Sequence, residues 1–421
     1  MRVLWFSTNP ACYKSSQTNN GGYNGGGWMS SLQQELMKCG DIELGICFCM
    51  DNQLQKVEQQ GVIYYPIPYH RKKTKDKFLD IIHYKDVRRD EVLWPYYINK
   101  FKETINDFNP DVIEIFGSEL YIGLAVIAAK ELSKPCCIHI QGILSLYIYS
   151  FLPPSMSKLK YYMSEGLFRV YSKFQYLTYW RRSIYREKKI FQAASNVIGR
   201  TEWDKEAMEI LAPQAKYHYG GEILRPCFYE KSLRTIPTKP IIVTTSSNAS
   251  YKGFDLVLKI ADILKNVMHI DFEWKVFGNI TPRFFEKIAN LSHQDLNINI
   301  CGVATAEQLR EALLHSTVYV QPSYIENSPN SVSEAQILGV PVVATNVGGT
   351  SSMVTHGKNG FLFPATDPYM AAYSIKYLID NEKINVEIGR QACYTALLRH
   401  DKIKIIEQLL NTYKDILNCV G

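Results

Sequence analysis

The sequence predicts an α/β protein with two doubly wound, Rossmann-like domains, and three observations support this prediction. The chain has 421 residues, enough for two domains that each bury their own core. In both halves, short apolar runs rich in β-branched residues alternate with helix-length segments, the pattern of parallel sheets covered by helices. A proline-rich segment without periodicity, 213–240, separates the halves. We therefore expect domains at 1–225 and 226–400 and a last helix within 401–421.

The composition argues against several classes of protein. A net charge of +6 is too small to indicate nucleic-acid binding by itself. Arg2 leads directly into the apolar run VLWFST, unlike a secretory signal, and no apolar run reaches the roughly 18 residues needed to cross a bilayer. The ten cysteines lack Cys-x-x-Cys spacing or nearby histidines, so we expect core residues of a reducing cytosol rather than zinc ligands. These features predict a cytoplasmic protein.

The first half begins with a buried strand at 3–7 and a glycine-rich loop that leads into an amphipathic helix at 28–38. Gly26 and Gly27 let backbone approach a ligand closely, and the helix start favours negative charge. A flexible surface loop is the alternative. Further strands are expected at 43–49, 61–66, 111–116, 136–141 and 196–198, with helices at 95–108 and 119–132.

Segment 145–192 has a different composition from the rest of this half. Nine lysines and arginines oppose two glutamates, and tyrosine, phenylalanine and tryptophan are interleaved with them. Aromatic and basic side chains together suit a membrane interface carrying anionic lipid. They equally suit an acidic glycan, or a helix that packs its aromatic face on the core. The basic cluster at 70–75 favours the membrane, and no nucleic-acid recognition motif is present.

The second half repeats the alternation of strands and helices. Strands are expected at 241–245, 272–277, 297–301, 318–321 and 341–345, with helices at 330–338, 368–380, 383–399 and 403–417. After the first of these strands, Lys252 lies at a helix start, where its ammonium can offer a point charge to a phosphate. A solvated lysine is the alternative.

The segment 318–350 combines two buried strands with a polar loop and a helix. In parallel sheets ligands bind beyond the carboxyl ends of the strands, where Glu326 and the helix start fall. The N–H groups of Asn330, Ser331 and Val332 lack intrahelical partners and form an anion site. Glu326 and Glu334 are far enough apart to accept hydrogen bonds from separate hydroxyl groups. Together they suit a sugar nucleotide, whereas two solvated glutamates near a helix start are the alternative.

These residues resemble a known signature. The two glutamates, followed by Ala335, Gly339, the run PVVA at 341–344 and Gly348-Gly349, are similar to those of retaining glycosyltransferases of family 4 (group 1). The resemblance covers essentially the whole chain. It implies the GT-B fold, in which two Rossmann-like domains face each other across a cleft and the C-terminal helix crosses back to the N-terminal domain.

The resemblance also implies an activity. A family member of the hexosyltransferase type transfers a sugar from a nucleotide donor, here a UDP- or GDP-sugar, to a hydroxyl of a glycan or lipid-linked acceptor, with retention of configuration. We expect no cofactor, and no metal because an Asp-x-Asp pair is absent. A role in bacterial surface-glycan assembly, at the inner face of the membrane, would fit the basic aromatic segment.

Family positions imply roles for individual residues. Lys252 would grip the donor diphosphate, Glu326 the sugar hydroxyls and Glu334 the ribose hydroxyls, while His139 would lie near the reacting carbon. The catalytic set is therefore His139, Lys252 and Glu326. The expected donor-binding set is Gly26, Gly27, Ser247, Lys252, Gly278, Val303, Glu326, Asn330, Ser331, Val332 and Glu334.

One departure from the family pattern concerns positive charge. Many relatives carry an arginine five or six residues before the lysine, where this chain has Ser246 and Ser247. Another cation must replace it, or backbone holds the phosphate. Arg200 is a candidate for this contact, with a structural salt bridge as its alternative, and Gln141 is a candidate for phosphate or acceptor contact.

Two other functions stay open at this point. A GT-B sugar-nucleotide epimerase would share the fold, although acid and base residues for the sugar C2 position are not identifiable. A non-catalytic sugar-nucleotide-binding subunit would be consistent with the absent arginine. Product analysis with and without acceptor separates these functions from transfer.

Overall fold

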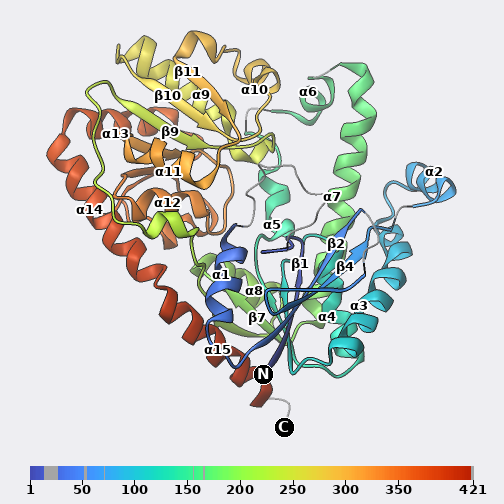
Figure 1. Cartoon of the computed structure of the whole chain (residues 1–421). Coiled ribbons are helices and arrows are strands. Elements are labelled where there is room, and N and C mark those ends of the chain that lie inside the picture. Colours follow the sequence, from blue (N-terminus) through green and yellow to red (C-terminus); the bar gives the residue numbers. More distant parts are fainter. Residues whose placement is uncertain (14–26, 52–54, 71, 155, 165, 419–421) are drawn as a thin grey trace.

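Two sheets organise the chain, as the sequence predicts (Figure 1). The computed structural model describes residues 1–13, 27–51, 55–70, 72–154, 156–164 and 166–418. The first sheet has the strand order β3-β4-β2-β1-β5-β6-β7-β8, and the second has the order β11-β10-β9-β12-β13-β14. All neighbouring strands are parallel except β3 and β4. The doubly wound α/β prediction is confirmed.

The first domain contains strands β1 (Arg2–Ser7), β2 (Glu43–Met50), β3 (Val57–Gln59), β4 (Val62–Pro68), β5 (Val112–Phe116), β6 (Cys136–His139), β7 (Asn196–Gly199) and β8 (Lys216–Tyr219). Its helices are α1 (Gly27–Met37), α2 (Thr74–Ile82), α3 (Trp94–Phe108), α4 (Ala125–Glu131), α5 (Leu144–Tyr147), α6 (Lys158–Met163), α7 (Leu167–Ala193) and α8 (Glu202–Leu211). The strands read as near-continuous apolar runs because helices cover both faces of the sheet.

The second domain contains strands β9 (Ile241–Thr245), β10 (Glu273–Phe277), β11 (Ile298–Gly302), β12 (Val318–Gln321), β13 (Val342–Thr345) and β14 (Phe361–Phe363). Its helices are α9 (Phe254–Asp262), α10 (Pro282–Ala289), α11 (Ala306–Leu314), α12 (Asn330–Ile337), α13 (Pro368–Asp380) and α14 (Glu382–Arg399). The chain then continues into α15 (Lys402–Asn418).

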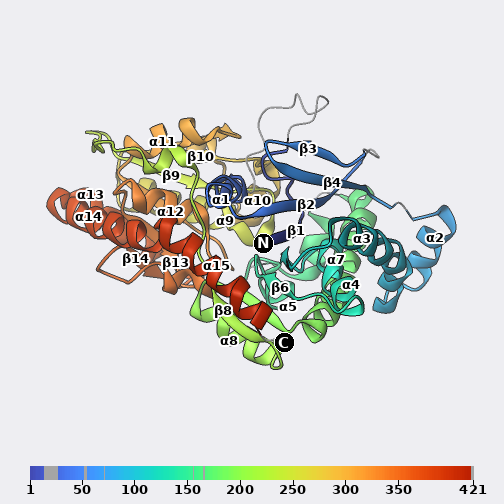
Figure 2. The same cartoon turned by 60° about the horizontal axis from the view of Figure 1, so that its bottom comes forward.

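Helix α15 returns to the first domain, which confirms the expected crossing (Figure 2). Its residues Ile405 and Leu409 pack in the same apolar cluster as β1 and β2. Nε1 of Trp5 on β1 donates a hydrogen bond to Oη of Tyr413 at 3.1 Å. The C-terminal end of the chain thereby packs against the first strands of the first domain.

Several elements differ from the sequence prediction. Segment 213–240 is not purely a connection, because Lys216–Tyr219 forms β8 at the edge of the first sheet. Only one of its four side chains is buried, so the strand has no apolar run by which to recognise it. β6 ends at His139 rather than at residue 141, and α4 begins at Ala125 after a 3₁₀ turn rather than at 119.

The basic aromatic segment forms α5, α6 and the long helix α7, which reach across to the second domain (Figure 1). Phe151, Tyr161 and Trp180 join the same apolar cluster as Phe254 and Phe285 of the second domain. Part of the segment is therefore core, one of the three alternatives that the composition left open. No helix in the described ranges combines the length and apolarity needed to cross a bilayer.

Candidate functional site

A pocket of about 410 Å³ lies where the carboxyl ends of β9, β10 and β12 face helix α1 of the first domain. Eight of the eleven residues in the expected donor-binding set line it: Gly27, Ser247, Lys252, Gly278, Val303, Asn330, Ser331 and Glu334. Glu326 and Val332 are not in its lining. Gly26 lies outside the described residues.

Close contacts between backbones occur at the strand ends of the second domain. At Gly278, where φ is 123°, a Cβ atom would lie 1.9 Å from the carbonyl oxygen of Ser246. At Gly348, where φ is 51°, a Cβ atom would lie 1.9 Å from the carbonyl oxygen of Glu326. Both positions require glycine for conformation and for space. Adjacent loops at the strand ends are therefore held against one another.

Lys252 and Glu326 are in direct contact. Lys252 ends a 3₁₀ turn (Ser250–Lys252) before α9, and its Nζ donates to Oε1 of Glu326 at 2.6 Å. The same oxygen accepts hydrogen bonds from Ser323 Oγ at 2.7 Å and Gln321 Nε2 at 3.1 Å. Burial opposes the charge of the lysine, but the Glu326 carboxylate and the nearby Tyr251 and Tyr319 together raise the pKa of Lys252 above its ordinary value. The ammonium therefore stays charged at the edge of the pocket.

Glu334 is held by an arginine that the sequence prediction did not include. Nε and Nη2 of Arg225 each donate to a different carboxylate oxygen of Glu334, both at 2.8 Å. This two-pronged pairing is the geometry that a guanidinium favours with a carboxylate. Burial raises the pKa of Glu334, and the arginine opposes that rise. Both side chains line the pocket.

Arg225 also explains the need for glycine at the start of α1. A Cβ atom on Gly27 would lie 2.8 Å from Cδ of Arg225. Arg225 belongs to segment 213–240, which reads in sequence only as a connection, and no local motif marks this residue. It supplies positive charge within the pocket, whose lining contains Ser246 and Ser247 where many relatives have an arginine.

Arg200 forms a buried salt bridge, which was the structural alternative to a phosphate contact. Its Nη1 lies 2.7 Å from Oε1 of Glu222, and only 7% of the residue is exposed. It does not line the donor pocket. Of the two arginines, Arg225 is therefore the one placed to act on a ligand in that pocket.

The start of α12 presents two free amides rather than three. Pro329 occupies the N-cap position, and the N–H of Val332 donates to its carbonyl oxygen at 3.0 Å. The expectation of an unpaired Val332 amide is wrong, because the first turn closes with an i to i+3 hydrogen bond. In the described part of the chain, the amides of Asn330 and Ser331 have no acceptor. Both residues line the pocket, and free amides at a helix start favour negative charge.

His139, which the family resemblance places near the reacting carbon, lies in the core of the first domain and does not line this pocket. Its Nδ1 lies 2.7 Å from Oε1 of Glu114, and its ring packs between Trp28 and Phe116. Only 1% of the residue is exposed. Gln141 follows the end of the strand at the contact between domains, where its carbonyl oxygen accepts a hydrogen bond from Asn327 at 3.3 Å.

Two further groups lie near the strand ends of the first domain. Glu119 accepts a hydrogen bond from the amide of Gly142 at 2.7 Å, and burial raises its pKa to about 7. Burial and the nearby Glu326 carboxylate raise the pKa of Tyr147. Neither residue belongs to a recognisable local motif. Within the described ranges, no cluster of three or more His, Cys, Asp or Glu side chains is suited to a metal ion.

Comparisons with known proteins point to one family. The family model described as glycosyl transferases group 1 matches residues 228–393. The chain is 29% identical over 236 residues to D-inositol 3-phosphate glycosyltransferase of Paenarthrobacter aurescens, covering 50% of this chain and 55% of that protein. It is 28% identical over 194 residues to trehalose synthase of Pyrococcus horikoshii, covering 44% and 45%. The chain thus spans about half the length of these curated relatives.

Solved structures share the fold over nearly the whole chain. Sucrose-phosphate synthase from Thermosynechococcus elongatus superposes with a TM-score of 0.70 at 14% identity, covering 99% of both chains. The Anabaena protein Alr3699/HepE in complex with UDP-glucose gives a TM-score of 0.62 at 15% identity, covering 99% of this chain and 100% of that one. At such identities the likeness is one of fold, and it confirms the two-domain GT-B architecture.

Proposed function

Residues 228–393 belong to the glycosyl transferases group 1 family, and from this premise we propose that the chain is a retaining glycosyltransferase of family 4. It transfers a sugar from a UDP- or GDP-sugar to a hydroxyl of a glycan or lipid-linked acceptor. The supporting observation is the pocket of about 410 Å³. Lys252, the Arg225–Glu334 pair and the free amides of α12 meet there, and together they suit a nucleotide diphosphate.

Each part of the donor has a complementary group in this proposal. The diphosphate binds between the Lys252 ammonium and the amides of Asn330 and Ser331. The ribose hydroxyls donate to Glu334, and the base meets the backbone near Val303. The transferred sugar extends toward Glu326, whose Oε2 has no hydrogen-bond partner among the described residues.

The proposed reaction needs no nucleophile from the protein. The acceptor oxygen forms a bond to the anomeric carbon as the bond from that carbon to the diphosphate breaks. A diphosphate oxygen on the same face takes the acceptor proton. Lys252 stabilises the negative charge that develops on the leaving group, with Arg225 as a second cation in the pocket. Because side chains supply this charge, the reaction is proposed to be independent of a metal ion.

Thermal unfolding with free nucleotides tests the donor site. A ligand that binds only the folded protein stabilises it, by about 2.7 kcal/mol at a concentration one hundred times its dissociation constant. We expect UDP or GDP to raise the melting temperature by a few degrees, with cytidine monophosphate as the control. No rise with any nucleoside diphosphate would contradict the proposal. Nucleotide release that requires an acceptor would then separate transfer from epimerisation and from binding alone.

We also propose that the tip formed by α6 and the start of α7 contacts an anionic membrane at the cytoplasmic face. Large apolar side chains are exposed there, including Leu159 at 74% and Phe168 at full exposure. Lys158 and Lys160 flank Leu159 and are exposed as well. Figure 1 shows α6 at the edge of the molecule. Exposed apolar and basic side chains together favour the surface of a bilayer containing anionic lipid.

Vesicle sedimentation tests this contact. Substituting both Leu159→Ser and Phe168→Ser is expected to reduce binding to phosphatidylglycerol vesicles at low salt at least about fivefold, because burying each apolar side chain is worth about 1.5–3 kcal/mol. Ile403→Ser is the matched control, since Ile403 is 71% exposed on α15. Equal binding by the double variant and the wild type would rule out this surface.

A further inference from the structure

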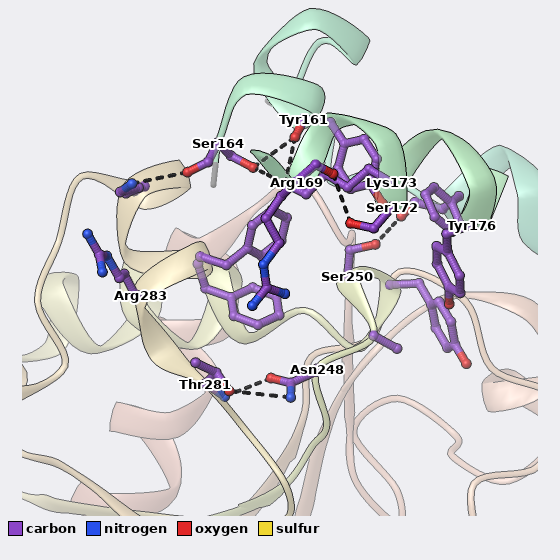
Figure 3. A pocket seen from close by; sticks show the side chains of 16 residues that line it. Tyr161, Ser164, Arg169, Ser172, Lys173, Tyr176, Asn248, Ser250, Thr281 and Arg283 are labelled. Carbon is purple, nitrogen blue, oxygen red and sulfur yellow. Dashed lines mark hydrogen bonds between the residues drawn. The ribbon is translucent and has the colours of Figure 1, made fainter. Parts of the chain in front are cut away.

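A second cavity, of about 740 Å³, lies between α6–α7 of the first domain and the second domain (Figure 3). One wall includes Tyr161, Arg169 and Tyr176, and the opposite wall includes residues 248–251 and 281–285. Its volume exceeds that of the first pocket, which is about 410 Å³. Because its walls come from both domains, the cavity exists only when the domains are close together.

Basic side chains line this cavity. They are Arg169, Lys173, Arg283 and Lys287, and the described lining contains no aspartate or glutamate. Lys173 Nζ already donates to Tyr161 O at 2.8 Å, and Lys287 Nζ donates to Ser164 O at 3.1 Å.

The two arginine side chains remain available to a ligand. Neither guanidinium has a hydrogen bond or ion pair within the described ranges, and Figure 3 shows Arg169 reaching into the space between the walls. A concave site with unmatched positive charge attracts an anion, and a guanidinium binds carboxylate or phosphate with two parallel hydrogen bonds.

The rest of the lining suits a sugar. The rings of Tyr161 and Phe284, whose centroids are 6.3 Å apart, form part of the wall together with Tyr176. Aromatic walls with a few polar groups are typical of sites for small organic ligands. Asn248 and Thr281 supply amide and hydroxyl groups at the opposite side, hydrogen-bonded to each other.

The β9–α9 turn borders both this cavity and the donor pocket. Tyr251 lines the cavity, and the next residue, Lys252, lines the donor pocket. The ring of Tyr251 packs against Tyr147 at 5.5 Å and Trp180 at 6.4 Å between centroids. A molecule in the cavity is therefore adjacent to the group that would hold the donor diphosphate.

We propose that this cavity is the acceptor subsite and that it takes an acidic saccharide, a sugar chain that carries carboxylate or phosphate groups. Arg169 and Arg283 bind the anionic group, the aromatic wall contacts the sugar rings, and the hydroxyl to be modified points toward Lys252 and Glu326. The assignment rests on the proposed glycosyltransferase function and adds the chemical class of its acceptor.

Calorimetric titration with tetragalacturonate, which carries four carboxylates, tests the proposal against the neutral maltotetraose. We expect wild type to bind tetragalacturonate more tightly, with an affinity that falls as salt rises. The double substitution Arg169→Gln with Arg283→Gln should weaken this binding at least about tenfold, roughly the worth of one charge-assisted hydrogen bond. Arg181→Gln, on an exposed position of the same helix α7, should leave it unchanged.

The effect of nucleotides separates this subsite from the proposed function. The double variant should keep its stabilisation by UDP or GDP, because Arg169 and Arg283 do not line the pocket of about 410 Å³. Three results would overturn the subsite while nucleotide binding still stands. Tetragalacturonate binds wild type and the double variant equally well, wild type binds maltotetraose as tightly as tetragalacturonate, or wild type does not bind tetragalacturonate. Absence of any nucleotide effect on wild type instead overturns the proposed function itself.

Discussion

Replacing Lys252 by alanine is expected to reduce sugar transfer at least about a hundredfold, or about 2.7 kcal/mol of transition-state stabilisation. The lysine contributes in two ways. Its charge, which the contact with Glu326 at 2.6 Å maintains, balances the charge that develops on the leaving diphosphate. Its removal also leaves the Glu326 carboxylate, only 6% exposed, without a positively charged neighbour.

Steady-state kinetics of the purified Lys252→Ala variant check this prediction. Because the leaving group gains charge mainly in the transition state, kcat should fall more than KM rises. Lys239→Ala is the matched control, since Lys239 forms an exposed ion pair with Asp271 and neither residue lines the pocket. A folded Lys252→Ala protein with near-normal kcat would show that the lysine does not act on the diphosphate.

Replacing Glu334 by alanine is expected to reduce transfer by a similar factor, at least about a hundredfold. The substitution removes the proposed acceptor for the ribose hydroxyls. It also leaves Arg225, which is largely buried and paired through two hydrogen bonds of 2.8 Å, without its carboxylate. The nucleotide is then held less tightly and in the wrong orientation.

The direct pairing of Glu334 with Arg225 adds a sharper expectation. Residues in contact show non-additive effects, so Glu334→Ala combined with Arg225→Ala should lose less activity than the product of the two single losses. The comparison uses kcat/KM and the affinity for UDP or GDP, with Glu387→Ala on α14, which pairs with the exposed Arg390, as the control. Fully multiplicative losses in the double variant would mean that the two side chains act independently.

The order of strands and helices was predictable from the sequence, and so was the meeting of Lys252 and Glu334 in one pocket beyond the strand ends. Both residues follow a recognisable strand within a strand, turn and helix unit, and such units can be recognised from local sequence. The near-continuous apolar runs of β1, β5 and β12 identify strands covered on both faces. Periodicity and turn residues carry this information directly.

Contacts between distant segments were decided only by the tertiary structure. Arg225 and Glu334 are 109 positions apart, and no local pattern states that a residue between β8 and β9 reaches α12. The burial of His139 depends on Trp28 and Phe116 folding over it. The cavity between α7 and the second domain likewise forms from segments that meet only on folding. Local spacing determines which backbone groups face a site, but side-chain direction and partners across a domain boundary depend on the packing of the whole chain.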